Sequence, residues 1–262
     1  MDIRIKAQTA IRVWRNFGLG EVLRIPFRKI VAQKHLKLAG TDPVASFHNL
    51  VSFTVPSLEF LTACGRFQES AEKIDSYEEY LRLFNLRTHK PRHGFFGEIY
   101  DLGAGLGFVL FVLIEAEKPR LVIETGIAAG ASSNLILNRL NAIESGELIS
   151  VDITSKVGEL VEQKLKNRWN VKVLPKLFKR KAFLHILNSH QNATIFLHDS
   201  DHSLQWQIFE ISSAIKCLPS VKHIMVDDVS EEFQSFVLND LPGWNLVVID
   251  EGRKFSGYLS RK

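Results

Sequence analysis

The sequence predicts an α/β protein with a doubly wound, largely parallel sheet of seven strands whose last strand runs antiparallel. Short apolar segments alternate with helical patterns from about residue 108 onward, at the spacing of βαβ units. Several of these segments end in an acidic residue. The last two are joined by the short link Asp250-Glu251-Gly252, which is too short for a crossover helix and therefore predicts an antiparallel pairing.

The pattern assigns each element in turn. We expect strands at residues 121–124, 148–152, 171–174, 194–197, 223–226, 245–249 and 255–259. We expect helices at residues 108–116, 132–143, 156–167, 176–188, 203–218 and 231–239. The stretch 88–107 is rich in Gly, His, Pro and Arg and is predicted to be loop. Helices on both faces make the arrangement Rossmann-like, and ligands bind at the carboxyl ends of such strands.

Composition and charge divide the chain in two. Its 262 residues are 45% hydrophobic, which supports a large core and excludes a wholly disordered chain. Residues 1–100 are predicted to be an N-terminal helical, basic extension and cap, and residues 101–262 the α/β domain. Residues 1–40 hold nine Lys/Arg and two Asp/Glu, whereas the whole chain has a net charge of only +4. This amphipathic arm fits packing on its own domain or on a second copy of the chain, or contact with an anionic membrane surface.

The location and partners are constrained by what the sequence lacks. Cys64 and Cys217 are too few and too far apart for a disulfide framework or a zinc site. The longest apolar run, residues 108–114, is too short to span a bilayer, and no signal-peptide pattern opens the chain. We therefore expect a cytoplasmic protein. Because residues 41–262 are slightly acidic, nucleic acid is a poor fit as partner.

Two glycine-rich stretches compete as a cofactor loop. Residues 101–107 read Asp-Leu-Gly-Ala-Gly-Leu-Gly but follow a poor strand, so we interpret them as a lid or a helix entry. Residues 124–132 follow a buried strand and open a helix, and Asp152 ends the next strand. Gly126 permits a tight turn and Gly130 a close backbone approach to a ligand. The alternative is an ordinary strand–helix turn.

Acidic residues also follow two later strands. Asp199 ends one strand, and Asp227 and Asp228 end the next, so the three carboxylates predict a Mg²⁺ site. The alternative is helix capping, by Asp199 or Asp201 for the helix from residue 203 and by Asp228 for the next. His202 lies at the same mouth and is a candidate general base, with a surface or capping histidine as the alternative.

As an ordered set, these motifs resemble the class I S-adenosylmethionine-dependent methyltransferases. The nearest branch is the catechol-type, metal-dependent O-methyltransferases, with their cephalosporin-hydroxylase-like relatives. The resemblance covers about residues 105–260, and the final strand fits the antiparallel seventh strand of that branch. It is carried by Glu124, Gly126, Gly130, Ser132, Asp152, Asp199, His202, Asp227 and Asp228.

The resemblance implies S-adenosyl-L-methionine as cofactor. Glu124, Gly126 and Ser132 would line its methionine end, Gly130 would also contact the cofactor, and Asp152 would bind the ribose hydroxyls. It further implies Mg²⁺ held by the three aspartates and a hydroxyl acceptor on a small molecule or sugar. His202 and Asp199 would be the catalytic residues, with His202 where the branch has a lysine.

The chain also departs from that branch. Pro219-Ser-Val-Lys stands where Pro-Gly-Gly is usual, and no small or acidic residue for adenine follows the strand at 171–174. Residues 41–107 and the loop after Asp228 are expected to form the acceptor pocket. Two other functions stay open: a glycosyltransferase using Asp199-Ser-Asp201 as a D-x-D motif, and a non-catalytic cofactor-binding protein of the same fold. An NAD-dependent oxidoreductase is disfavoured, because neither glycine loop has its spacing after a good strand.

Overall fold

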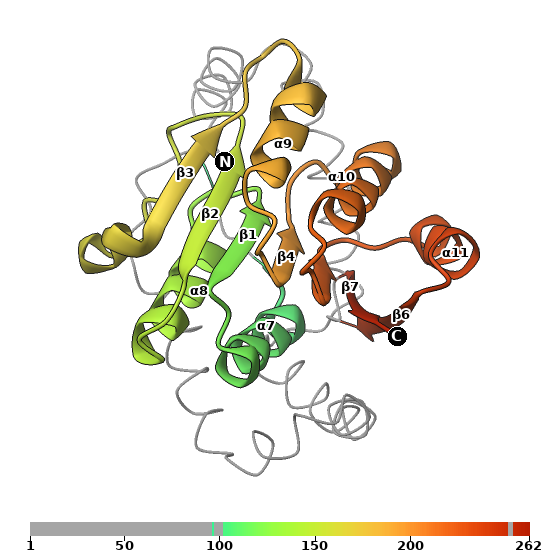
Figure 1. Cartoon of the computed structure of the whole chain (residues 1–262), viewed down its shortest axis with the longest axis horizontal. Helices are drawn as coiled ribbons and strands as arrows, with labels where there is room; N and C mark the ends of the chain where they lie inside the picture. Colours follow the sequence, from blue (N-terminus) through green and yellow to red (C-terminus); the bar gives the residue numbers. More distant parts are fainter. Residues whose placement is uncertain (1–95, 97–101, 251–253) are drawn as a thin grey trace, which may run out of the picture.

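The computed structural model describes residue 96 and residues 102–250 and 254–262. The predicted N-terminal extension, with the basic arm and Cys64, lies outside these residues. The described part forms one seven-stranded sheet in the order β3-β2-β1-β4-β5-β7-β6 (Figure 1). The strands are β1 (Leu121–Thr125), β2 (Glu147–Asp152), β3 (Trp169–Val173), β4 (Ile195–His198), β5 (His223–Val226), β6 (Trp244–Asp250) and β7 (Phe255–Arg261).

The pairing confirms the predicted fold class. Strands β1 to β5 pair in parallel with one another, and β7 lies antiparallel between β5 and β6. The strand order reverses between β1 and β4, where a doubly wound sheet opens a crevice at its carboxyl edge. This switch point places the ends of β1 and β4 side by side.

Helices cover both faces of the sheet. They are α7 (Ala104–Glu117), α8 (Ala131–Ala142), α9 (Lys179–Asn188), α10 (Leu204–Cys217) and α11 (Glu231–Asp240), with a 3₁₀ turn η2 (Gln163–Arg168). Successive residues of β1 face opposite layers, because Val122 packs in a cluster with α7 and α8, and Ile123 in a cluster with α9, α10 and α11. Both residues are fully buried, which explains why the strands are apolar without alternation.

The first glycine-rich stretch is the entry to a helix. Gly103 is the N-cap of α7, and the amide of Gly107 donates to the carbonyl of Gly103 at 2.9 Å. The predicted loop at 88–107 is therefore wrong at its end. Leu106 and Leu110 are fully buried, and this packing outweighs the low helix propensity of the glycines. Among the described helices, none is long and apolar enough to cross a membrane.

The helix predicted at 156–167 is the main correction to the fold. The structure has an irregular segment there, followed only by η2. The amides of Gly158 and Leu160 donate to the carbonyls of Ala128 and Ala129, at 3.0 and 2.9 Å, instead of closing a helical turn. Gly158 also has φ +75°, and a Cβ there would lie 2.2 Å from the ring of Trp169. The segment therefore packs across the loop that joins β1 to α8.

Candidate active site

The candidate site lies at the carboxyl ends of β1, β4 and β5. Backbone hydrogen bonds tie these ends together: the Asp199 amide donates to Thr125 at 2.8 Å, and the Asp227 amide donates to His198 at 2.9 Å. Gly126 has φ +81°, and a Cβ there would lie 1.7 Å from the carbonyl oxygen of Asp199. A side chain at Gly126 is therefore excluded, and the glycine loop forms one wall with the acidic cluster.

The rest of the glycine loop opens helix α8. Gly130 is the N-cap at φ +89°, and no side chain accepts a hydrogen bond from the first turn of α8 within the described residues. The close neighbour of Gly130 is Gly158, whose Cα would lie 2.8 Å from an added Cβ. Gly130 thus admits the segment after β2. Ser132, in the first helical turn, is 3% exposed.

Glu124 is fully buried under the loop. Its Oε1 accepts hydrogen bonds from the hydroxyls of Ser133 and, at 2.6 Å, Ser150. Its Oε2 is buried and has no hydrogen-bond partner among the described residues. Burial raises the pKa of Glu124 to about 7, although the serine hydroxyls counteract part of the rise. One oxygen of this acid is therefore held in place and the other is left unsatisfied.

Asp152 links the end of β2 to the glycine loop. Its Oδ2 accepts from the amide of Ile127 at 2.9 Å, and its Oδ1 accepts from Ile153 at 2.6 Å and Thr154 at 3.1 Å. Burial raises the pKa of Asp152, and these backbone donors oppose the rise. The carboxylate therefore positions the loop directly, whatever it does for a ligand.

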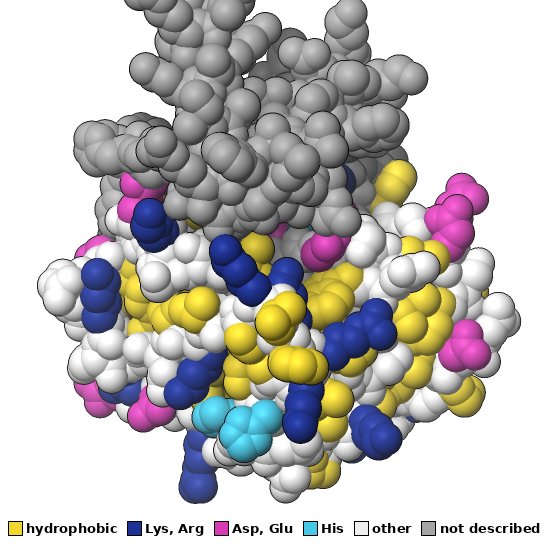
Figure 2. All heavy atoms as spheres, turned by 90° about the horizontal axis from the view of Figure 1, so that it is seen from above, with side chains coloured by type: hydrophobic (Ala, Val, Ile, Leu, Met, Phe, Trp, Pro, Cys, Tyr) yellow, Lys and Arg dark blue, Asp and Glu magenta, His cyan; other side chains and the backbone are white. Residues whose placement is uncertain are grey.

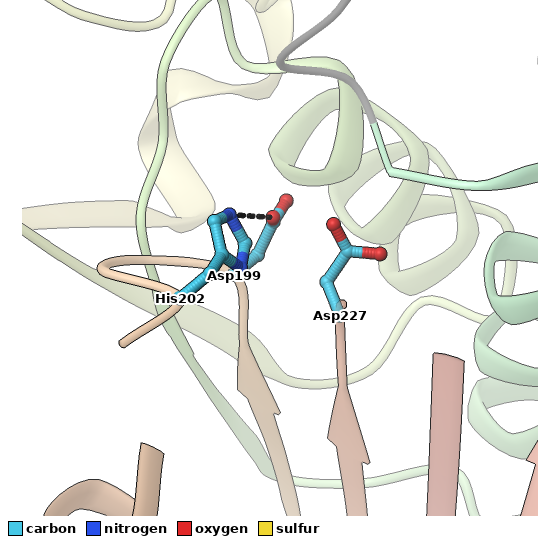
Figure 3. A group of neighbouring side chains, drawn as sticks. All are labelled: Asp199, His202 and Asp227. Carbon is cyan, nitrogen blue, oxygen red and sulfur yellow. Dashed lines mark ion pairs between the residues drawn. The ribbon is translucent and has the colours of Figure 1, made fainter. Parts of the chain in front are cut away.

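Asp199, His202 and Asp227 converge above the strand ends. Figure 3 shows His202 and Asp199 from the loop after β4 facing Asp227 at the end of β5. One possible ligand atom from each side chain lies within 4.8 Å of the others. The Nε2 of His202 is 4.0 Å from Oδ1 of Asp199, and its Nδ1 is 3.6 Å from Oδ2 of Asp228. The structure thus brings together all four residues predicted for the metal and the base.

Asp228 differs from its neighbour Asp227 in exposure. Its side chain is 39% exposed, whereas that of Asp227 is 3% exposed. Asp228 has φ +55°, and the Gln207 amide holds this turn by donating to the carbonyls of Asp227 and Asp228, at 3.1 and 2.9 Å. The carboxylate of Asp228 therefore stands at the rim of the site.

Lys254 is a member of the cluster that the sequence reasoning missed. Its Nζ donates to Oδ2 of Asp227 and lies 3.6 Å from Oδ1 of Asp228. Ser256 also donates to Asp227, at 3.2 Å. A signal was present in the sequence, because an antiparallel last strand must begin at the edge where β5 ends. Lys254 directly precedes that strand.

The charges of the cluster are unequally satisfied. Burial raises the pKa of Asp199 well above its ordinary value, and Asp227 adds to the rise. Burial also opposes the ionisation of Asp227, but Lys254 and His202 outweigh it and lower its pKa. Enclosure lowers the pKa of His202, although Asp228 opposes this. Burial opposes the charge of Lys254, but the carboxylates outweigh it and raise the pKa of Lys254, so this lysine stays charged near pH 7.

A buried glutamate on α10 supports the loop that carries Asp199 and His202. Glu210 is 1% exposed and accepts from Thr125 at 2.6 Å and from Trp206 at 2.6 Å. Nδ1 of His198 lies 2.6 Å from the same carboxylate, and the Ser200 hydroxyl donates to it at 3.1 Å. No sequence pattern indicates this role, because Glu210 looks like an ordinary polar residue of an amphipathic helix.

Different side chains accept backbone hydrogen bonds at the starts of helices α10 and α11. Ser230 caps α11 by accepting from Phe233 at 3.2 Å, so Asp228 does not cap it. Before α10, the carboxylate of Asp201 accepts from the amide of Ser203 at 3.0 Å. Of the aspartates considered, Asp201 therefore has the local turn-forming role.

Comparison with known proteins finds solved structures to which this chain is similar. No model of a known protein family matches the chain, and no curated protein sequence matches it. The SAH-bound Podospora anserina methyltransferase PaMTH1 is 10% identical with a TM-score of 0.47, covering 74% of this chain and 96% of its own. The Bacillus cereus O-methyltransferase in complex with SAH is 16% identical with a TM-score of 0.45, covering 72% and 91%. TomG, an O-methyltransferase from Streptomyces achromogenes in complex with SAM, is 15% identical with a TM-score of 0.47, covering 62% and 81%.

Proposed function

We propose that this protein is an S-adenosylmethionine-dependent methyltransferase that methylates a hydroxyl group of a small molecule or sugar, assisted by Mg²⁺. One observation carries the proposal: the glycine turn at Gly126 abuts the backbone of Asp199. A cofactor on the loop and a hydroxyl at the acidic cluster would therefore share one site. Such alignment of two reactants is the main contribution that a protein makes to methyl transfer.

The residues of the loop fit the cofactor. The first turn of α8 offers amide groups without a side-chain cap, which suits a carboxylate. The buried, unsatisfied Oε2 of Glu124 lies under the same loop. We assign Glu124, Gly126 and Ser132 to the methionine end, Gly130 to the same cofactor loop, and Asp152 to the ribose hydroxyls. When bound, the cofactor supplies the electrophilic methyl group.

The acidic cluster fits a hard divalent cation. Asp199 and Asp227 offer carboxylate oxygens, Asp228 stands at the rim, and Mg²⁺ prefers such ligands. Lys254 already contacts Oδ2 of Asp227, so a bound cation would compete with it for this carboxylate. A cation held there would lower the pKa of a bound hydroxyl.

His202 is the better candidate for the proton acceptor. A general base must be neutral before it acts, and the pKa of His202 is lowered whereas that of Lys254 is raised. The side chain of His202 is 29% exposed, so it can meet a substrate. We propose that its imidazole takes the hydroxyl proton and that Asp199 orients it.

The test is transfer of a labelled methyl group from S-adenosylmethionine to a panel of hydroxylated sugars, lipids and phenols, with Mg²⁺ and with EDTA. We expect at least one acceptor to be labelled, and more so with Mg²⁺. Cofactor binding with no transfer to any acceptor would support a non-catalytic binding protein. The glycosyltransferase alternative loses support because Asp201 of the D-x-D triplet is engaged with Ser203. Titration with nucleotide sugars tests it directly.

A further inference from the structure

A basic, apolar tip lies on the turn between β3 and α9 and takes no part in the proposed chemistry. We define the tip as residues 176–181, Lys-Leu-Phe-Lys-Arg-Lys. The side chains of Leu177 and Phe178 are 73% and 80% exposed. Single exposed apolar residues are ordinary, but two large adjacent ones at the apex of a turn need an explanation other than the core. The turn lies at the top of Figure 1.

The backbone of the tip holds an aromatic side chain in an unusual conformation. Phe178 is the N-cap residue of α9 and has φ +63°, in the left-handed region that bulky residues seldom adopt. Gly or Asn is common at such positions, yet this chain has a phenylalanine whose ring lies in solvent. Arg180 is stacked over the ring of Phe209, at 4.8 Å from its centre, which anchors α9 behind the turn.

The charge around the tip has one sign. From the start of β3 to the end of β4, residues 169–198 contain five Lys/Arg, four of them in the tip, and no Asp or Glu. Lys176 and Lys181 are exposed and form no ion pair within the described part of the chain. The α/β domain as a whole is slightly acidic, so this positive charge is concentrated locally. Such a surface attracts a polyanion.

Apolar side chains continue beside the tip at the same edge of the sheet. Val173 pairs with Asp152 at the ends of β3 and β2, and Ile153 follows directly. Ile153 is 40% and Val173 48% exposed. Figure 2 looks onto the molecule from above Figure 1 and shows hydrophobic side chains interleaved with Lys and Arg on this face. The surface therefore combines exposed hydrophobic side chains with cationic ones.

We propose that the tip docks on an anionic lipid surface, with Leu177 and Phe178 entering the interface and the lysines meeting headgroup phosphates. A second copy of the chain is a poor occupant, because two such tips would repel each other. Nucleic acid would use the charge and stack on one aromatic ring, but exposed Leu177, Ile153 and Val173 add nothing to base stacking. Membranes use both kinds of group.

The position of the tip gives this docking a direction. The turn follows the carboxyl end of β3, and Asp199 and Asp227 follow the carboxyl ends of β4 and β5 in the same sheet. A membrane bound at the tip would therefore lie at the edge that carries the candidate active site. Docking at the tip does not depend on catalysis, so vesicle binding can be tested independently of methyl transfer.

The test uses the full chain and vesicles of phosphatidylcholine, alone or with an equal part of phosphatidylglycerol. We expect co-sedimentation with the anionic vesicles only. Replacing Lys176 and Lys181 by Ser should weaken it about thirtyfold, since each cation near such a surface contributes about a fivefold factor. L177S/F178S should weaken it by at least about tenfold. The matched controls K118S/K216S and L238S change exposed residues elsewhere and should bind like the wild type.

A site-specific readout separates the tip from the basic arm at residues 1–40. In a Cys64→Ser background, Phe178→Cys carries an environment-sensitive fluorophore, and Leu238→Cys on α11 is the control. We expect a blue shift at position 178 with anionic vesicles and none at position 238. Binding that both tip variants leave unchanged, the absence of the shift, or a shift with single-stranded RNA but not with vesicles would overturn the proposal.

Discussion

The two edges of the sheet bury acids in opposite ways. At the amino ends of the parallel strands, here called the amino edge, Glu117 lies beside two basic side chains. Its carboxylate is 3.0 Å from Nζ of Lys222 and 3.7 Å from Nε2 of His223. At the carboxyl edge three aspartates share Lys254 and His202. The pKa of Glu117 falls to about 2, chiefly through His223, whereas the pKa of Asp199 rises through burial and Asp227. The acid at the amino edge is therefore matched by basic partners, whereas the carboxyl edge has more acidic than basic side chains.

This difference separates stabilising charges from functional ones. A buried acid with matched partners contributes to stability, whereas crowded carboxylates repel one another and persist where a cation or substrate uses them.

The largest expected effect is on turnover. Asp199→Ala should lower Mg²⁺-dependent methyl transfer on the order of 10³-fold, because a cation ligand and the partner of His202 are lost together. Asp228→Ala should act in the same direction, and cofactor affinity should hardly change in either. Asp201→Ala is the matched control, two residues from Asp199. Full activity in both Asp199→Ala and Asp228→Ala would remove the cation site from the account.

Glu124 is a buried acid at the carboxyl edge that forms no ion pair within the described residues, so its effect on stability should follow pH. A raised pKa means that the folded state binds the proton more tightly, and stability is lost as pH rises from 4.5 through about 7. Between pH 5 and 8 this group should cost about 2 kcal/mol. Urea unfolding of Glu124→Gln should lack that loss. An equal slope in wild type and variant would contradict the raised pKa.

Lys254 is predicted to compete with a bound cation. Lys254→Met frees the carboxylate of Asp227 and should tighten Mn²⁺ binding, as a substitute for Mg²⁺, by about tenfold. The signal of free Mn²⁺ in electron paramagnetic resonance measures this. Lys222→Met removes the lysine of the amino edge and should leave Mn²⁺ binding unchanged. A Lys254→Met protein that binds Mn²⁺ no better than wild type would show that Lys254 does not compete with the cation for Asp227.

The smallest expected effect belongs to the amino edge. A lowered pKa means that Glu117 contributes stability above its unfolded pKa, and that this is lost as pH falls from 4.5 through about 2. Glu117→Gln should cost about 1 kcal/mol at pH 7, since Lys222 is half-exposed and partly screened. At pH 3 the cost should be less than half as large. A loss of unfolding free energy that does not change with pH would show that Glu117 stabilises the fold through packing and not through its charge.

Much of the fold could be predicted because the buried strands are short apolar runs with clear ends. The strand at 223–226 is observed at those residues, and the strand at 121–124 is longer by one residue. The helix expected at 156–167 failed because its amides donate to the glycine loop, a contact between segments that no local pattern encodes. Long-range hydrogen bonds of this kind override propensity.

The candidate site was predictable where one residue type marks a strand end. Asp199, Asp227 and His202 follow strands that the topology places side by side. Lys254 and Glu210 were missed because their roles depend on pairing across the sheet and on the buried face of α10. A lysine before a final strand is informative only once that strand is known to be antiparallel.

The most direct test of the central claim is calorimetric titration of the full chain with S-adenosylmethionine. We predict saturable, stoichiometric binding that Asp152→Ala weakens by at least about tenfold, because a ribose hydroxyl loses its acceptor and the loop loses its anchor. Thr154→Ala and Asp199→Ala should bind like the wild type. No binding of S-adenosylmethionine, or saturable binding of NAD or a nucleotide sugar in its place, would contradict the account.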